Sequence, residues 1–226
     1  MLLLALDTAL DACSVALYDS AADRIVASQS EVIGKGHAER LMAMISAVMA
    51  EAKVGFPDLD RIGVTVGPGS FTGIRVGLAT ARGLALAAGK PVVGVSTLDA
   101  IARSAPGDGP IMVVLDARRG EVYAGLYDGN HSPISPPALL TLDQAACAVT
   151  AAVAKMFGSG ADLVASAQPA ESFEISGIDG YPDILHVARL TAVTAAYLEP
   201  PKPLYLRAPD AKPQTRGRVA RTGDAA

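Results

Sequence analysis

The chain has 226 residues, of which 50% are hydrophobic and 4% aromatic, and its formal net charge at pH 7 is −4. This length and composition allow one large α/β domain or two small lobes with well-filled aliphatic cores. The acidic balance gives no general attraction to nucleic acid or membranes, and two cysteines are too few for a disulfide framework or a zinc cluster. With neither a secretory signal nor a membrane span in the pattern, we expect a cytoplasmic protein.

The first predicted element is a β-hairpin at residues 2–18, in which two apolar runs flank a turn opened by Asp7. A third strand is predicted at residues 24–30. The hairpin pattern returns at residues 111–128, where Asp116 takes the place of Asp7 and both copies end in Leu-Tyr-Asp. Five identities in eighteen aligned positions lie within chance, but each copy begins one half of the chain. We interpret the two hairpins as an internal duplication.

The next element is a helix at residues 37–53 that is apolar on two sides. One face has the spacing of a core face and contains Ala38, Leu41, Met42, Ile45, Val48, Met49 and Ala52. A second strip, which the same core cannot use, contains Ala43, Met44, Ala47 and Ala50. Such a helix is either sandwiched inside the fold or docked against a partner, and methionine suits adaptable contact surfaces. We favour a docking surface formed together with the following helix.

Strand 62–66 runs into a glycine turn at residues 67–73, and we expect a helix at residues 72–88 that is uninterrupted from Ile74. A turn between a strand and a helix can hold an anion at the helix N-terminus. This turn lacks the spacing and the lysine of a Walker loop, and a dinucleotide fingerprint would need glycine at Thr72 and an acid about twenty residues later. We therefore expect Ser70 or Thr72 to cap the helix and the glycines to supply turn geometry.

One flank of this helix has almost no side chains, because positions 69, 73, 77, 81, 85 and 89 are Gly, Gly, Gly, Ala, Ala and Gly. Glycine in a helix costs about 1 kcal/mol relative to alanine, so another element must approach closely enough to compensate. The stripe alone fits the chain's own sheet and a partner helix about equally. The second apolar strip of helix 37–53 favours the partner.

The remaining elements complete two lobes joined near residues 104–110. The first lobe ends with strand 92–95 and a short helix from Leu98. For the second we expect strands at 111–116, 121–127, 161–165 and 203–207, and helices at 142–156 and 184–198. From Arg207 to the end, the chain contains five basic residues, two acidic residues and no aromatic residue. This composition predicts a disordered basic tail.

Strands followed by alternating helices and strands in each half predict an α/β fold of two mixed sheets with flanking helices and a reduced second lobe. We place the lobes at residues 1–104 and 111–207 and the tail at 208–226. This is the plan of the actin, sugar-kinase and Hsp70 ATPase superfamily (the ASKHA fold), in which the two hairpin aspartates face each other and hold nucleotide phosphates through Mg²⁺. The turn at residues 8–12 contains no glycine, so its backbone is poorly suited to a phosphate. An active ATP-dependent phosphotransferase of this fold, with Asp7 and Asp116 on Mg²⁺, remains the alternative hypothesis.

Several segments together resemble the TsaB (YeaZ) family, and the resemblance covers residues 1 to about 212 apart from the stretch 129–182. The segments read LALDTALDACSVALYD, HAERLMAMI, VGPGSFTGIRVGLATARGLALAAGKPVVGVSTLDAIA, VLDARRGEVYAGLYD and PLYLRAPDA. The family is a bacterial subunit of the machinery that makes N6-threonylcarbamoyladenosine next to the anticodon of tRNAs reading ANN codons. The resemblance implies a non-catalytic scaffold without a cofactor, because Thr97 and Ile101 stand where the TsaD paralogue has its metal-binding histidines.

The resemblance also implies the partners. They are a TsaD-type paralogue in a heterodimer, a TsaE-type ATPase in the larger complex, a second copy of the chain in a homodimer, and tRNA indirectly. By position, the contact surface comprises Ala43, Met44, Ala47, Gly73, Val76, Gly77, Thr80, Ala81 and Leu84. Phe71 and Arg75 are expected to shape the glycine turn. A separate tRNA-binding module is supported only by the basic tail.

Overall fold

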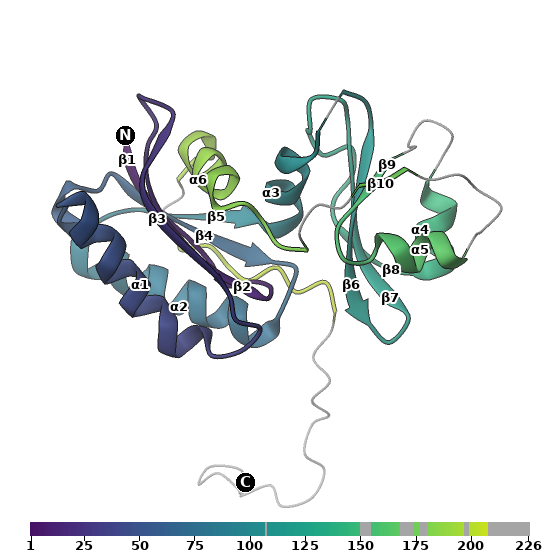
Figure 1. Cartoon of the computed structure of the whole chain (residues 1–226), viewed down its shortest axis with the longest axis horizontal. Coiled ribbons are helices and arrows are strands. Elements are labelled where there is room, and N and C mark those ends of the chain that lie inside the picture. Colours follow the sequence, from purple (N-terminus) through teal and green to yellow (C-terminus); the bar gives the residue numbers. More distant parts are fainter. Residues whose placement is uncertain (107, 150–154, 168–173, 177–179, 197–198, 208–226) are drawn as a thin grey trace, which may run out of the picture.

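The computed structural model describes residues 1–106, 108–149, 155–167, 174–176, 180–196 and 199–207 (Figure 1). The basic tail 208–226 and parts of the 129–182 stretch therefore lie outside the described residues. The described chain forms two lobes, each built on a five-stranded sheet. No helix in these ranges is long and apolar enough to cross a bilayer.

The first sheet has the strand order β3-β2-β1-β4-β5, with β1 antiparallel to β2 and parallel to β4. Its strands are β1 (Leu2–Asp7), β2 (Ala12–Asp19), β3 (Arg24–Val32), β4 (Arg61–Gly67) and β5 (Val92–Ser96). The helices of this half are α1 (His37–Ala52), the short η1 (Phe56–Asp58), α2 (Phe71–Ala88) and α3 (Thr97–Ser104).

The second sheet has the order β10-β9-β6-β7-β8. Its strands are β6 (Ile111–Arg118), β7 (Glu121–Tyr127), β8 (Ala138–Thr141), β9 (Lys155–Phe157) and β10 (Glu174–Ser176). The second half of the chain also contains the helices α4 (Leu142–Ala148), α5 (Ala161–Ala167) and α6 (Ile184–Val193).

The two sheets have the same topology, because β6 to β10 occupy the places of β1 to β5 with the same parallel and antiparallel pairings. The counterparts of the 16-residue α1 and the 18-residue α2 are the seven-residue helices α4 and α5. This confirms the predicted duplicated, two-lobed α/β architecture with a reduced second lobe.

Two strands predicted in the second half were wrong, and two predicted helices are shorter than expected. Residues 161–165 are helical in α5, and the helix expected at 142–156 ends at Ala148, while Lys155–Phe157 pairs as a strand. The helix expected at 184–198 ends at Val193. Residues 203–207 form no strand and are tied to β4 through the N–H of Leu204, which donates to the carbonyl of Val66 at 2.8 Å.

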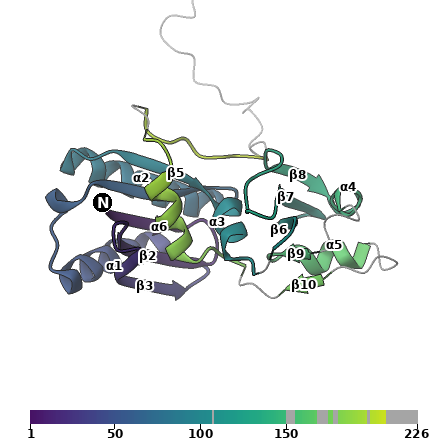
Figure 2. The same ribbon diagram turned by 90° about the horizontal axis from the view of Figure 1, so that it is seen from above.

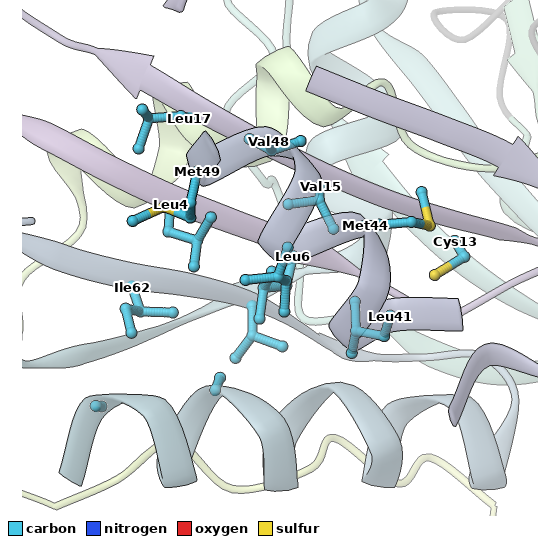
Figure 3. Packing of buried hydrophobic residues seen from close by; sticks show 14 of the residues in the cluster. Leu4, Leu6, Cys13, Val15, Leu17, Leu41, Met44, Val48, Met49 and Ile62 are labelled. Carbon is cyan, nitrogen blue, oxygen red and sulfur yellow. The ribbon is translucent and has the colours of Figure 1, made fainter. Parts of the chain in front are cut away.

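Alternate residues of β1 face two different helical layers, as expected for a strand buried on both sides. Leu4 and Leu6 belong to the core beneath α1 and α2, whereas Leu3 and Ala5 belong to the core beneath α6. Figure 1 shows α1 and α2 side by side on one face of the sheet and α6 on the other. Figure 3 shows how α1 side chains meet those of β1 and β2 within the larger core.

The boundary placed between the lobes was wrong for the last helix. Although α6 follows the second sheet in sequence, Val187 and Ala188 are buried against the first sheet. Arg61 adds hydrogen bonds from its guanidinium to the carbonyls of Thr191 and Thr194, at 3.0 and 2.9 Å. Residues 111–207 are therefore not one separate lobe, because their C-terminal part packs on the first.

Candidate functional site

The glycine turn before α2 is filled by the chain's own β1–β2 turn. The Ser70 hydroxyl caps α2 by accepting from the N–H of Gly73 at 3.2 Å, and the Ser70 N–H donates to the carbonyl of Ala9 at 2.7 Å. A Cβ atom added at Gly69 or Gly73 would lie only 2.2 or 2.0 Å from the carbonyl oxygens of Ala9 and Thr8. The glycines thus permit close approach between backbones, which confirms that they supply the geometry of the turn.

Asp7, one of the two proposed magnesium ligands, is completely buried. Its Oδ1 accepts hydrogen bonds from the hydroxyl of Thr65 at 2.6 Å and from the N–H of Ala9 at 3.0 Å. Its Oδ2 is buried and has no hydrogen-bond partner among the described residues. Burial raises the pKa of this carboxyl above its ordinary value of 3.8, and the two hydrogen bonds oppose that shift. Asp7 is therefore an internal structural group.

A cleft of about 580 Å³ lies where the two hairpin turns and the glycine turn meet. Its lining includes Leu10, Asp11, Ser70, Asp116, Arg118 and Arg207. Asp116 Oδ1 accepts from the N–H of Arg118 at 2.7 Å. Because Asp116 faces this cleft while Asp7 is buried inside the first lobe, the two carboxylates do not face each other. The residues present do not fit the two-aspartate Mg²⁺-nucleotide site of the alternative hypothesis.

The surface of α1 and α2 carries five of the nine residues predicted to contact a partner. Ala43 is exposed, and Ala47, four residues later, is half-buried. On α2, Val76, Thr80 and Leu84 form a second row at the same spacing, and all three are half-buried. We call these five residues the two-helix surface.

The other four residues face the chain's own core, so their assignment to a partner-facing surface was wrong. Met44 is 1% exposed and belongs to the same core cluster as Cys13 of β2 (Figure 3), and Ala81 is completely buried. Gly73 and Gly77 are buried as well. A Cβ at Gly77 would lie 2.5 Å from the Thr8 hydroxyl and 3.2 Å from a Val64 methyl. The bare flank of α2 thus serves close packing on the first lobe.

Several exposed apolar residues beside the two-helix surface were missed. Met42 is 47% exposed and Leu86 is 87% exposed. Ala79 and Gly83 are also at the surface, and so is Ala50, which was predicted in the second apolar strip of α1. The sequence assigned Met42 to the core and Met44 to the surface, and the structure reverses the two. Because both residues are methionines close to the boundary between core and surface, periodicity alone does not distinguish them.

Phe71 and Arg75 were expected to shape the glycine turn, but they hold the C-terminal segment instead. The Arg75 guanidinium carbon lies 3.6 Å from the centre of the Phe71 ring. Its Nε donates to the hydroxyl of Tyr205 at 2.8 Å, and the Phe71 and Tyr205 rings are 5.1 Å apart. We call residues 199–207 the strap, since Figure 2 shows this segment running past the first lobe toward the second.

The two positions predicted to correspond to the paralogue's metal-binding histidines lie inside the fold. Thr97 and Ile101 are completely buried in α3. Within the ranges that the structure describes, His, Cys, Asp and Glu side chains nowhere gather in threes in a way that could hold a metal ion.

Comparison with known families gives one matching model over most of the chain. It is described as TsaD, tRNA N6-adenosine threonylcarbamoyltransferase, and it matches residues 22–208. The tRNA threonylcarbamoyladenosine biosynthesis protein TsaB of Escherichia coli K12 is 38% identical over 137 residues, which are 59% of this chain and 58% of that protein. The matched segment therefore spans less than two-thirds of this relative's length.

Two further relatives match over nearly the whole chain. An uncharacterized protein of Mycobacterium tuberculosis H37Rv is 35% identical over 212 residues, which are 93% of each chain. A crystal structure of an uncharacterized Pseudomonas aeruginosa protein, described as similar to peptidase YEAZ, superposes with a TM-score of 0.79 at 31% identity. That superposition covers 91% of this chain and 99% of the other.

Proposed function

Since this chain belongs to the TsaB (YeaZ) family of tRNA threonylcarbamoyladenosine biosynthesis proteins, we propose that it is a non-catalytic scaffold that binds a TsaD-type threonylcarbamoyltransferase. In this role it supports formation of N6-threonylcarbamoyladenosine next to the anticodon of ANN-decoding tRNAs in the cytoplasm. A TsaE-type ATPase joins the larger complex, and the same contact surface pairs two copies of the chain when the paralogue is absent.

The two-helix surface is the observation that carries this proposal. Ala43 and Ala47 are small and lie at i, i+4 spacing, so the backbone of another helix can come close to α1 there. The exposed Met42 beside it adds adaptable apolar contact area, which is costly to leave in water on a monomer. This surface is formed by α1 and α2 alone, so it is available to a partner without rearrangement of the lobes.

The rival hypothesis of an ATP-dependent phosphotransferase finds less support. That chemistry needs carboxylates that hold Mg²⁺ against the phosphates, together with a backbone cradle. Asp7 is buried and hydrogen-bonded to Thr65, so it is not available as a ligand of Mg²⁺. We therefore assign no phosphoryl transfer to this chain.

The proposal is tested by placing a long charged side chain on the two-helix surface. Ala43 is exposed on α1 and arginine is a good helix former, so Ala43→Arg should leave folding intact. An overpacked contact costs about 1 to 3 kcal/mol, which corresponds to a roughly 5- to 150-fold weaker Kd for the TsaD-type paralogue. Sedimentation velocity of mixtures of the two purified proteins measures this Kd.

Ala22→Arg is the matched control, because Ala22 is exposed in the β2–β3 turn, away from both helices. It should bind the paralogue like the unmodified chain. Threonylcarbamoyl transfer by the reconstituted complex should decline with Ala43→Arg and remain with Ala22→Arg. Equal affinity of the two variants for the paralogue would refute the assignment of the surface, and transfer by this chain alone would refute the scaffold role.

A further inference from the structure

A stretch with only basic charges runs through β4, α2 and β5. Residues 61–98 contain Arg61, Arg75, Arg82 and Lys90 and no acidic residue, although the whole chain has a net charge of −4. Arg61 is used internally, where it binds the last carbonyls of α6. The side chains of Arg75, Arg82 and Lys90 can contact an external partner. We call these three residues the basic ridge.

No carboxylate among the described residues offsets the charge of the basic ridge, and the side-chain contacts of its two arginines are with neutral groups. Arg75 donates to the Tyr205 hydroxyl, and the Arg82 guanidinium donates to the carbonyl of Pro201 in the strap. Arg75 and Arg82 are exposed, and neither they nor Lys90 form an ion pair with any described residue. Both contacts hold the arginines at the seam between α2 and the strap, so their charge is fixed in position at little further entropic cost.

A hollow of about 340 Å³ follows the ridge toward the C-terminus of α2. Arg82 and Lys90 line it together with Leu86, Pro91 and Pro200. Two cations therefore border one depression whose other walls are apolar. Such a depression suits a group that combines a negative charge with an uncharged body.

An exposed aromatic stack stands at the other end of the ridge. Phe71 is 46% exposed and Tyr205 is 38% exposed, although large aromatic rings gain most by burial. Arg75 lies over the Phe71 ring, and the two rings are tilted by 31° to each other. Aromatic rings and guanidinium planes are the groups on which unpaired nucleic-acid bases stack.

We propose that the basic ridge and the Phe71–Tyr205 stack form a direct RNA contact. The cations of the basic ridge bind backbone phosphates of the RNA, and an unpaired base stacks on the Phe71–Tyr205 pair. This goes beyond the proposed function, in which tRNA meets this chain only through the complex. The aromatic stack favours RNA over an acidic polypeptide, since carboxylates gain nothing from a planar apolar platform beside the charges.

The test uses the full chain and two fluorescently labelled probes, a 15-nucleotide poly(A) RNA and an unmodified tRNA transcript. Fluorescence anisotropy at several salt concentrations gives Kd and its salt dependence. Arg82→Glu should weaken binding of both probes by about three- to tenfold and lower the slope of log K against log salt by roughly 0.7 to 0.9, as expected when one phosphate contact is lost. Arg24→Glu is the control, since it changes the charge equally at an exposed position on β3, at the opposite edge of the sheet.

Phe71→Leu tests the stack, because leucine keeps apolar bulk and lacks a ring face. Loss of one base stack should weaken poly(A) binding by at least fivefold, with an unchanged salt slope. Tyr205→Leu should act in the same direction and serves as a second variant if Phe71→Leu lowers the melting temperature. Both variants should still bind the TsaD-type paralogue, which separates this proposal from the proposed function.

Three results would overturn the RNA contact. One is undetectable binding of both RNA probes by the unmodified chain at low salt. Another is equal weakening by Arg82→Glu and Arg24→Glu, which would show only a net-charge effect. The third is binding of poly-glutamate that Arg82→Glu weakens and Phe71→Leu leaves unchanged, because the ridge would then bind acidic polypeptide.

Discussion

Asp7 fixes the end of β1 to two neighbouring elements. Its Oδ1 accepts from the Thr65 hydroxyl on β4 and from the N–H of Ala9 in the following turn. Without those donors a buried carboxyl would cost several kcal/mol. The same burial keeps the carboxyl out of reach of any ligand in the cleft, so this residue contributes to the shape of the first lobe.

The raised pKa of Asp7 gives a prediction with a definite sign. The folded chain holds the proton more tightly than the unfolded chain, so the stabilisation is complete below about pH 4 and is lost as pH rises through the raised pKa of the folded state. Asp7→Asn keeps an oxygen for Thr65 and Ala9 and removes the ionisation.

We therefore expect the melting temperature of Asp7→Asn, relative to the unmodified chain, to increase from pH 4 to pH 8. Each kcal/mol corresponds to about 2 to 4 °C for a chain of this size. Differential scanning calorimetry across that range measures the trend. A difference that is flat or falls with pH would contradict the described environment of Asp7.

At the scale of single elements, α2 explains why glycine recurs along one flank. The helix lies so close to the β1–β2 turn that a Cβ at Gly73 would lie 2.0 Å from a backbone oxygen, which has no flexible end to move. A Cβ added at Gly83, which is exposed on the same helix, would meet nothing within 4 Å. The two glycines therefore differ in whether the fold needs a bare backbone at their positions.

Gly73→Ala and Gly83→Ala should change stability in opposite directions. Gly83→Ala gains helix propensity and should stabilise the chain by about 1 kcal/mol. Gly73→Ala should destabilise it by about 1 to 3 kcal/mol or more, because the added methyl overlaps the Thr8 carbonyl. Urea unfolding followed by circular dichroism measures both changes. Stabilisation by Gly73→Ala would mean that α2 does not pack against this turn.

The long elements were predictable from sequence, and their orientation was only partly so. Residues 37–53 and 72–88 each span several helical turns, so periodicity located α1 and α2 to within one residue. The sequence did not determine whether the glycine flank of α2 faces the chain's own sheet or a partner, since positions without side chains suit both equally well. The elements of the second lobe were predicted less accurately. The strand β9 has three residues and the helix α5 has seven, which are too few to show a hydrophobic period. The buried state of Asp7 depended on Thr65, 58 residues away, which no local pattern reveals.

For the whole molecule, each half contributes a helix that joins it to the other. Leu98 and Ile101 of α3 pack with Ile111, Val113 and Tyr127 of the second sheet in one buried cluster. The Tyr127 hydroxyl donates to Asp99 at 2.8 Å. Since α6 in turn covers the first sheet, the lobes share their cores and should unfold together.

The strap adds a second connection that truncation can test. Leu204 bonds to Val66 in the first lobe, while Arg207 donates to the carbonyl of Ala117 at 2.7 Å in the second. A chain ending at residue 198 loses these contacts and should melt at least ~5 °C lower, whereas a chain ending at Arg207 should melt like the full chain. Equal melting of all three forms would show that the strap does not hold the lobes.

The most direct test of the scaffold role is hydrogen–deuterium exchange of this chain with and without the TsaD-type paralogue. Our account expects new protection concentrated in α1 (His37–Ala52) and α2 (Phe71–Ala88), with little change in the β6–β7 hairpin that borders the cleft. Protection confined to the hairpin turns and the cleft, with α1 and α2 unchanged, would contradict it.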